Sequence, residues 1–88
     1  MTREEFLKNH DFMKVGMAVS SGNFNMAMMI VKRMRLNAAK AGVEELVPEL
    51  NNLEKAIMGR NVVLSKNVMA VLVAKRAELM KNIVNINS

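Results

Sequence analysis

One stretch decides the fold of this chain: Lys32-Arg33-Met34-Arg35-Leu36-Asn37-Ala38-Ala39-Lys40-Ala41-Gly42. It contains four basic residues and no acidic one. Its apolar positions, continued toward the N-terminus, recur at steps of three and four residues: Ala27, Ile30, Val31, Met34, Ala38 and Ala41. This spacing predicts one buried face of an amphipathic helix, and the basic residues fall mostly outside it. We therefore expect a helix with one side in a core and a positive side toward water.

Length and composition restrict the class of protein. A chain of 88 residues predicts a single domain covering residues 1–88, and a hydrophobic fraction of 51% with 24% charged residues is typical of a globular chain. The sequence contains no cysteine, which excludes disulfides and thiolate metal sites. It contains neither the apolar segment of a signal peptide nor one of membrane-spanning length. We expect a cytoplasmic protein without a membrane partner.

Apolar periodicity and glycine or asparagine turns divide the chain into four expected helices. They cover about residues 3–20, with a break near Asn9-His10, then 24–41, 45–58 and 62–84. Because the connections are short, neighbouring helices should pack side by side in opposite directions. The fold class is therefore predicted as all-α, an antiparallel four-helix bundle, with fraying after Asn82.

Helix starts are predicted from capping residues and from proline. Thr2 and Glu5 fit a capping box. Asp11 and Asn23 are candidate N-caps, and Pro48 should lie in the first turn of its helix. Further predicted positions are Gly42 as a left-handed C-terminal cap and either Asn61 or Ser65 as the cap of the last helix.

The net charge of +5 is distributed unevenly. There is no acidic residue between Asp11 and Glu44, whereas the charged residues from Glu44 to residue 58 are mostly acidic. One interpretation is that facing helices carry complementary charges. The other is a basic docking surface on the helix over residues 24–41, for an acidic partner.

Apolar residues add to that basic helix. Six consecutive apolar residues, 26–31, cannot all face one core, because they span more than one turn. Met29, with Met28, is expected to join Leu36 in an exposed apolar spot ringed by cations, which is the anatomy of a protein contact. The predicted partner-binding face contains Met29, Lys32, Arg33, Arg35, Leu36 and Lys40.

Several short patterns in the chain occur together in one known family. They are Lys32-Arg33-Met34-Arg35-Leu36-Asn37-Ala38, then Gly42, Glu44-Glu45-Leu46 and Leu53-Glu54-Lys55-Ala56, preceded by Gly22-Asn23-Phe24. Within residues 11–77 these patterns resemble the histidine-phosphotransfer (HPt) domain, the helical relay module of bacterial two-component signalling and its phosphorelays. The resemblance implies an HPt-like bundle. It also implies a protein partner, the receiver domain of a response regulator, whose active-site surface is acidic.

One residue differs from the family in a way that changes the chemistry. Lys32 occupies the position of the family's phosphoacceptor histidine. Neutral imidazole is a nucleophile near pH 7, whereas an unperturbed lysine, with a pKa of about 10.4, is an ammonium without a lone pair. Leu36 also replaces the small residue that leaves room for the receiver, while Arg35 keeps the family's basic residue. The resemblance therefore implies docking without phosphotransfer, with Lys32 and Arg35 as charge complements.

Catalysis and cofactor binding are not predicted. His10 is the only histidine, and we interpret it as an exposed residue in a helix-start turn rather than as a phosphoacceptor. No nucleophilic triad, metal-ligand spacing or phosphate loop is present in the sequence. The prediction is a non-catalytic interaction module with no cofactor and no metal. The alternatives are self-association as a structural bundle, for example a homodimer, and weak nucleic-acid binding, which a pI near 10.0 permits but which the lack of base-stacking aromatics argues against.

Overall fold

Helices make up the architecture of the chain. The computed structural model describes the backbone of residues 1–87 and the side chains of residues 1–83. Within them the α-helices are α1 (Arg3–Leu7), α2 (Asp11–Ser20), α3 (Phe24–Ala41), α4 (Val47–Met58) and α5 (Val62–Asn87), with a short 3-10 turn η1 (Glu44–Leu46) before α4. No strand occurs in this part of the chain. The expected all-helical class is confirmed.

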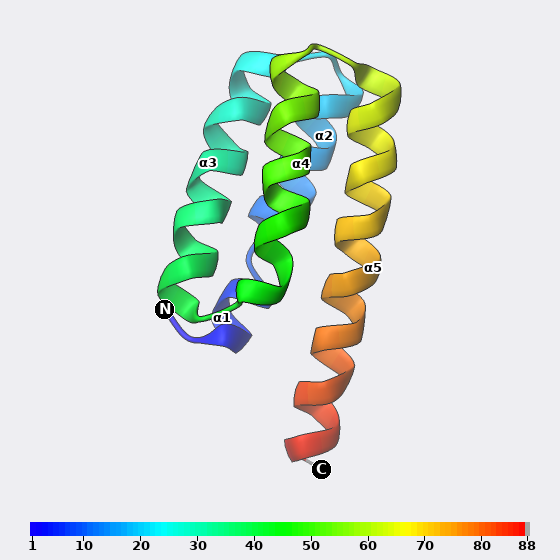
Figure 1. Ribbon diagram of the computed structural model, residues 1–88. Coiled ribbons are helices and arrows are strands. Elements are labelled where there is room, and N and C mark those ends of the chain that lie inside the picture. The colour runs from blue at the N-terminus through cyan, green and yellow to red at the C-terminus, as the bar shows by residue number, and fades with distance from the viewer. Residues whose placement is uncertain (88) are drawn as a thin grey trace.

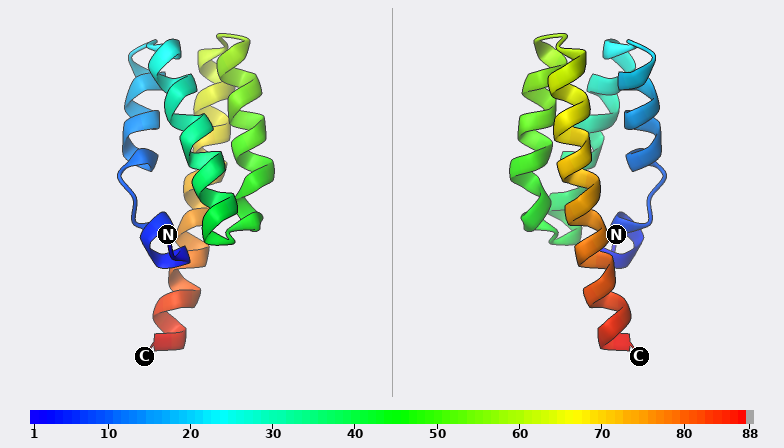
Figure 2. Two further views of the ribbon diagram at one scale, coloured as in Figure 1. Left: turned by 90° about the vertical axis from the view of Figure 1, so that its left-hand side faces the viewer. Right: turned by 90° about the vertical axis from the view of Figure 1, so that its right-hand side faces the viewer.

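The four longer helices pack around one core (Figure 1). The chain rises along α2, descends along α3, rises along α4 and descends along α5, and α1 lies across the lower end. Two side views show that the last turns of α5 extend past the ends of the other helices (Figure 2). The molecule measures 41 × 21 × 19 Å as a result.

The predicted buried stripe of α3 is confirmed. All six of its apolar positions are buried: Ala27, Ile30, Val31, Met34, Ala38 and Ala41. On α4 the same periodicity buries Leu50, Leu53, Ala56 and Ile57. The spacing of three and four residues therefore predicts which sides of α3 and α4 are buried. The opposite side of α3 faces solvent.

Most of the predicted caps are confirmed. Thr2 and Glu5 form both hydrogen bonds of a capping box. The Asn23 side chain accepts a hydrogen bond from the Met26 N–H, and Gly42 ends α3 with a φ of 71°. The Asn61 side chain accepts from the Leu64 N–H, so Asn61 is the cap and Ser65 is buried inside α5.

The first expected helix, residues 3–20, is two helices joined by a turn. The chain leaves the helical path at residues 8–10, where the Asn9 side chain accepts a hydrogen bond from the Asp11 N–H at 2.8 Å. The prediction of Asp11 as the cap is therefore wrong, since Asp11 is the first residue of α2. The turn lets the Phe6 and Phe12 rings meet edge to face, with 5.4 Å between their centroids.

Two other boundaries differ from expectation. The third expected helix starts with the 3-10 turn η1 and becomes α-helical only at Val47, with Pro48 in the first turn as predicted. The last helix, expected over residues 62–84, continues to Asn87, and fraying after Asn82 stays a prediction. Leu79, Met80 and Ile83 pack against the core. Ser88 lies outside the described residues.

Candidate functional site

Four of the six predicted partner-binding residues share the outer side of α3. Met29, Lys32, Leu36 and Lys40 are all exposed, and we call them the α3 face. Their spacing of three and four residues places them on one side of a helix, opposite the buried stripe. The two apolar members are the more unusual, because Met29 is 71% exposed and Leu36 is 62% exposed. On the α3 face, exposed apolar and cationic residues therefore alternate along the helix, in the order Met29, Lys32, Leu36 and Lys40.

Arg33 lies at the edge of the α3 face and reaches across to α2. Its Nε and Nη2 atoms donate hydrogen bonds of 2.9 and 2.6 Å to the two carboxylate oxygens of Asp11. The hydrogen bonds that Arg33 donates to Asp11 raise the pKa of Arg33 above its ordinary value. Because the fork of the guanidinium is occupied, Arg33 contributes to the contact between α2 and α3 more than to an open surface.

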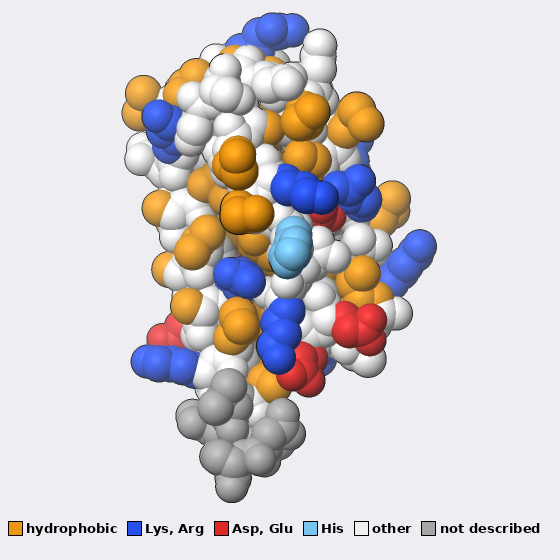
Figure 3. Space-filling view, turned by 180° about the vertical axis from the view of Figure 1, so that it is seen from behind, with side chains coloured by type: hydrophobic (Ala, Val, Ile, Leu, Met, Phe, Trp, Pro, Cys, Tyr) orange, Lys and Arg blue, Asp and Glu red, His pale blue; other side chains and the backbone are white. Residues whose placement is uncertain are grey.

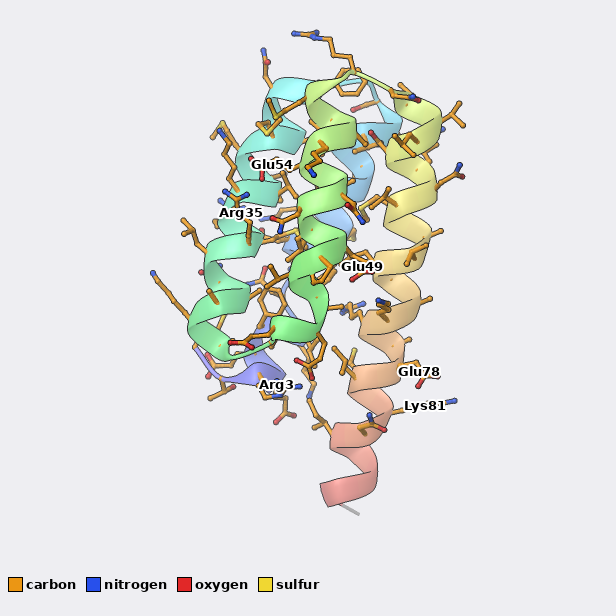
Figure 4. All side chains as sticks on the ribbon, viewed as in Figure 1. Arg3, Arg35, Glu49, Glu54, Glu78 and Lys81 are labelled. Carbon is orange, nitrogen blue, oxygen red and sulfur yellow. The ribbon has the colours of Figure 1, made fainter. Side chains whose placement is uncertain are left out.

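Arg35 lies at the other edge of α3 and points toward α4. Its guanidinium contacts the Glu54 carboxylate and lies 3.4 Å from the Asn51 side-chain oxygen. Figure 4 shows Arg35 and Glu54 pointing toward each other from the two helices. The six predicted residues thus divide into four on the α3 face and two in contacts between helices. Complementary charges between helices describe Arg33 and Arg35, whereas the docking surface stays a prediction for the four residues of the α3 face.

A third ion pair, between α4 and α5, follows the same design. The Lys75 Nζ lies 2.7 Å from the Glu49 carboxylate. In each of the three pairs the carboxylate is nearly buried: 8% of the side chain is exposed for Asp11 and 12% for Glu54 and for Glu49. The three cations are about half exposed. Neither Asp11 nor Glu49 carried a sequence signal for this role, because each partner lies more than twenty residues away.

The other groups considered for chemistry are His10 and the carboxylates. His10 is exposed at the position before α2, and its side chain makes no capping hydrogen bond. Among the described side chains, no group of three or more histidine or carboxylate residues is placed to hold a metal ion. Over the same residues, every helix is either too short or too polar to cross a membrane.

The chain was compared with models of protein families, with curated proteins and with solved structures, and none of the three comparisons gives a match. The functional argument therefore rests on the residues and their geometry.

Proposed function

We propose that this chain is a non-catalytic protein-interaction module that uses the α3 face to dock a protein with an acidic surface. The observation that carries the proposal is that Met29 and Leu36, both mostly exposed, share one side of α3 with the exposed Lys32 and Lys40. Apolar side chains in the centre exclude water when a partner binds, and flanking charges select the partner.

The charges on α3 favour an acidic partner over a basic one. No acidic residue occurs between Asp11 and Glu44, and the carboxylate of Asp11 is bound to Arg33. Glu54, the nearest acid on α4, is bound to Arg35. The ammonium groups of Lys32 and Lys40 make no ion pair with a described side chain, so they remain available to a carboxylate from outside.

The resemblance to HPt domains supports a receiver domain as the acidic partner. In this proposal the fold is an HPt-like antiparallel four-helix bundle, and the chain acts in the cytoplasm of a bacterium beside two-component signalling. Lys32 takes the place of the phosphoacceptor and binds the receiver by charge. Phosphate stays on the receiver, because the ammonium form of lysine has no lone pair to attack it.

A binding assay with charge reversal tests the α3 face. Purified receiver domains are titrated against the fluorescently labelled chain, and we expect Lys32→Glu to weaken binding about tenfold or more. Lys55→Glu makes the same change at an exposed position on α4 and serves as the matched control. Equal weakening by both variants would show unspecific attraction, and an absence of binding to every receiver at low salt would reject the receiver as partner.

A labelling assay tests the absence of phosphotransfer. A receiver carrying labelled phosphate is mixed with the chain and with a variant combining Lys32→His and Leu36→Gly. We expect label only on the variant, because it restores the imidazole and the space beside it. Label on the unmodified chain would contradict the proposal.

The two alternatives have their own measurements. Self-association predicts a dimer mass in light scattering at micromolar concentration, and the net charge of +5 opposes it. Nucleic-acid binding predicts retention on random DNA that falls steeply with salt. That mode is weakened because Arg33 and Arg35, two of the cations of α3, are already bound to carboxylates.

A further inference from the structure

A groove runs between α2 and α5, away from the α3 face. It encloses about 550 Å³ and is lined mainly by apolar residues, Gly16 and Val19 from α2 with Met69, Ala70, Val73 and Ala74 from α5. Figure 3 shows the molecule from this side, with hydrophobic side chains spread over the surface and acidic ones mainly near its lower end. Gly16, Ala70 and Ala74 have little or no side chain, so a partner backbone can come close to the floor of the groove.

Apolar residues occur on every side of the first half of α5, where the polar residues are Ser65, Lys66 and Asn67. Between residues 62 and 74 the only charge is Lys66. Leu72 is fully buried, whereas Val63 is 71% exposed and Val73 is 43% exposed. A helix that is apolar all round is typical of a position covered on every side, but here the bundle covers only one side of α5. The uncovered side is therefore a candidate surface for a partner.

The charges around the groove are positive. Lys66 lines it, and Arg76 lies at the lower end of the same contact, with its guanidinium carbon 4.8 Å from the centre of the Phe12 ring. α2 contains no acid after Asp11, and α5 contains none before Glu78. An incoming helix with carboxylates beside its apolar stripe meets Lys66 without meeting a like charge.

A second copy of this chain does not supply such a helix. Five of its eight acidic residues are in ion pairs within the chain: Glu4, Asp11, Glu45, Glu49 and Glu54. Two copies would also bring together two molecules of net charge +5. Charge complementarity therefore favours a different protein as the occupant.

We propose that the α2–α5 groove binds an amphipathic helix of another protein, with acidic residues on both sides of its apolar stripe. Leucine-sized anchors at three- and four-residue spacing fill the groove above Ala70 and Ala74, and an acidic residue pairs with Lys66. The groove shares no residue with the α3 face, so this interaction is independent of the function proposed above. A chain with both surfaces occupied links two partners.

The probe is a synthetic helix of about 18 residues, five turns long, with leucines along one stripe and glutamates elsewhere. A second peptide carries lysine at every glutamate position. Binding is followed by fluorescence anisotropy, and its location by NMR of chain labelled at the methionine methyl groups. Met69 reports the groove, Met29 the α3 face, and exposed Met58 serves as a reference.

We expect the glutamate peptide to bind and to shift the Met69 signal, and the lysine peptide to bind about tenfold or more weakly. Ala70→Glu should weaken the glutamate peptide to a similar degree, because it places a carboxylate in the groove. Ala70 is exposed, so thermal unfolding followed by circular dichroism should show an intact fold. The matched control is Ala39→Glu, the same change at an exposed position on α3.

Specific outcomes would overturn the proposal. They are equal affinity for the two peptides or no binding of either peptide. A shift of the Met29 NMR signal in place of the Met69 signal, or an unchanged affinity of Ala70→Glu for the glutamate peptide, would do the same. A dimer mass for the unmodified chain that Ala70→Glu converts to a monomer would identify a second copy as the occupant and would reject the acidic helix. Lys32→Glu should leave the peptide affinity unchanged, which separates this result from the test of the α3 face.

Discussion

The four contacts between neighbouring long helices are of two kinds. Three of them contain one ion pair each: Asp11–Arg33 between α2 and α3, Arg35–Glu54 between α3 and α4, and Glu49–Lys75 between α4 and α5. Among the described residues, the contact between α2 and α5 contains none and has an apolar groove in its place. The polar element of that contact is the Arg76 guanidinium over the Phe12 ring, so the uncovered apolar surface lies where no ion pair joins the two helices.

The three ion pairs act more on specificity than on net stability. Each carboxylate is nearly buried, so it loses most of its hydration on folding, and the partly exposed cation compensates for that loss. Removing the cation alone leaves an unpaired buried charge, whereas removing both partners costs less. Such pairs penalise any arrangement in which the wrong helices become neighbours.

The largest expected effect is on the free energy of unfolding, and it differs between two core residues on different sides of α5. Leu72→Ala should lower the free energy of unfolding by about 3 kcal/mol, because Leu72 is fully buried and leaves a closed cavity. Met69→Ala should cost about 2 kcal/mol or less, since Met69 borders the groove and solvent enters the vacated space. Urea unfolding followed by circular dichroism measures both, and equal losses would show that the α2–α5 contact is packed as tightly as the core.

The next effect concerns an ion pair. Arg33→Met should cost about 2 kcal/mol, because the nearly buried Asp11 carboxylate loses both of its hydrogen bonds. Combining it with Asp11→Asn should recover about half of that loss. Lys32→Met, at the neighbouring exposed position, is the control and should change stability by less than about 0.5 kcal/mol. Similar losses in Arg33→Met and Lys32→Met would show that the pair has no structural role.

A smaller effect distinguishes two glycines. Gly16→Ala should raise the free energy of unfolding by about 0.5–1 kcal/mol, because Gly16 lies inside α2 and an added Cβ would meet the Met69 methyl carbon at an ordinary 3.5 Å. Gly22→Ala should be destabilising, because Gly22 has a φ of 74°. Thermal unfolding of the two variants gives the comparison. A destabilised Gly16→Ala would mean that the groove wall does not tolerate one methyl group.

The smallest effect is a pH dependence of the folding stability, which comes from the ion pair between Arg3 and Glu45. A hydrogen bond from Arg3 lowers the pKa of Glu45, whose side chain is about half exposed. Because the folded pKa is depressed, the pair contributes stability above the unfolded pKa and loses it as pH falls through the folded value. Glu45→Gln should lower stability at pH 7 by a few tenths of a kcal/mol, and the difference should vanish once pH falls below the folded pKa of Glu45. A difference that persists at low pH would assign the effect to packing.

Local patterns predicted the elements better than the contacts between them. The buried stripe of α3, the Asn23 cap and the left-handed Gly42 depend on residues within a few positions of each other, so the sequence is sufficient for them. The partner of Asp11 depends on which helices become neighbours, which no local pattern reports. For the same reason Arg33 and Arg35 were grouped with the α3 face, although their side chains bind α2 and α4.

The helix α5 was the least predictable element. Its apolar residues follow no single stripe, so Val71 and Val73 are exposed while Leu72 between them is buried. A helix with an uncovered apolar side lacks the regular alternation from which burial is inferred. The ambiguity in the sequence and the groove in the structure therefore have the same physical origin.

Arg33 and Arg35 have one further consequence for α3. They are two residues apart, so their side chains project about 200° from each other around the helix axis. Arg33 forms its ion pair with α2 and Arg35 with α4. Because these two ion pairs act on opposite sides of α3, they oppose rotation of the helix about its own axis. The direction in which Met29 and Leu36 project is then fixed in the free chain, so the docking proposed above for the α3 face requires no reorientation of α3.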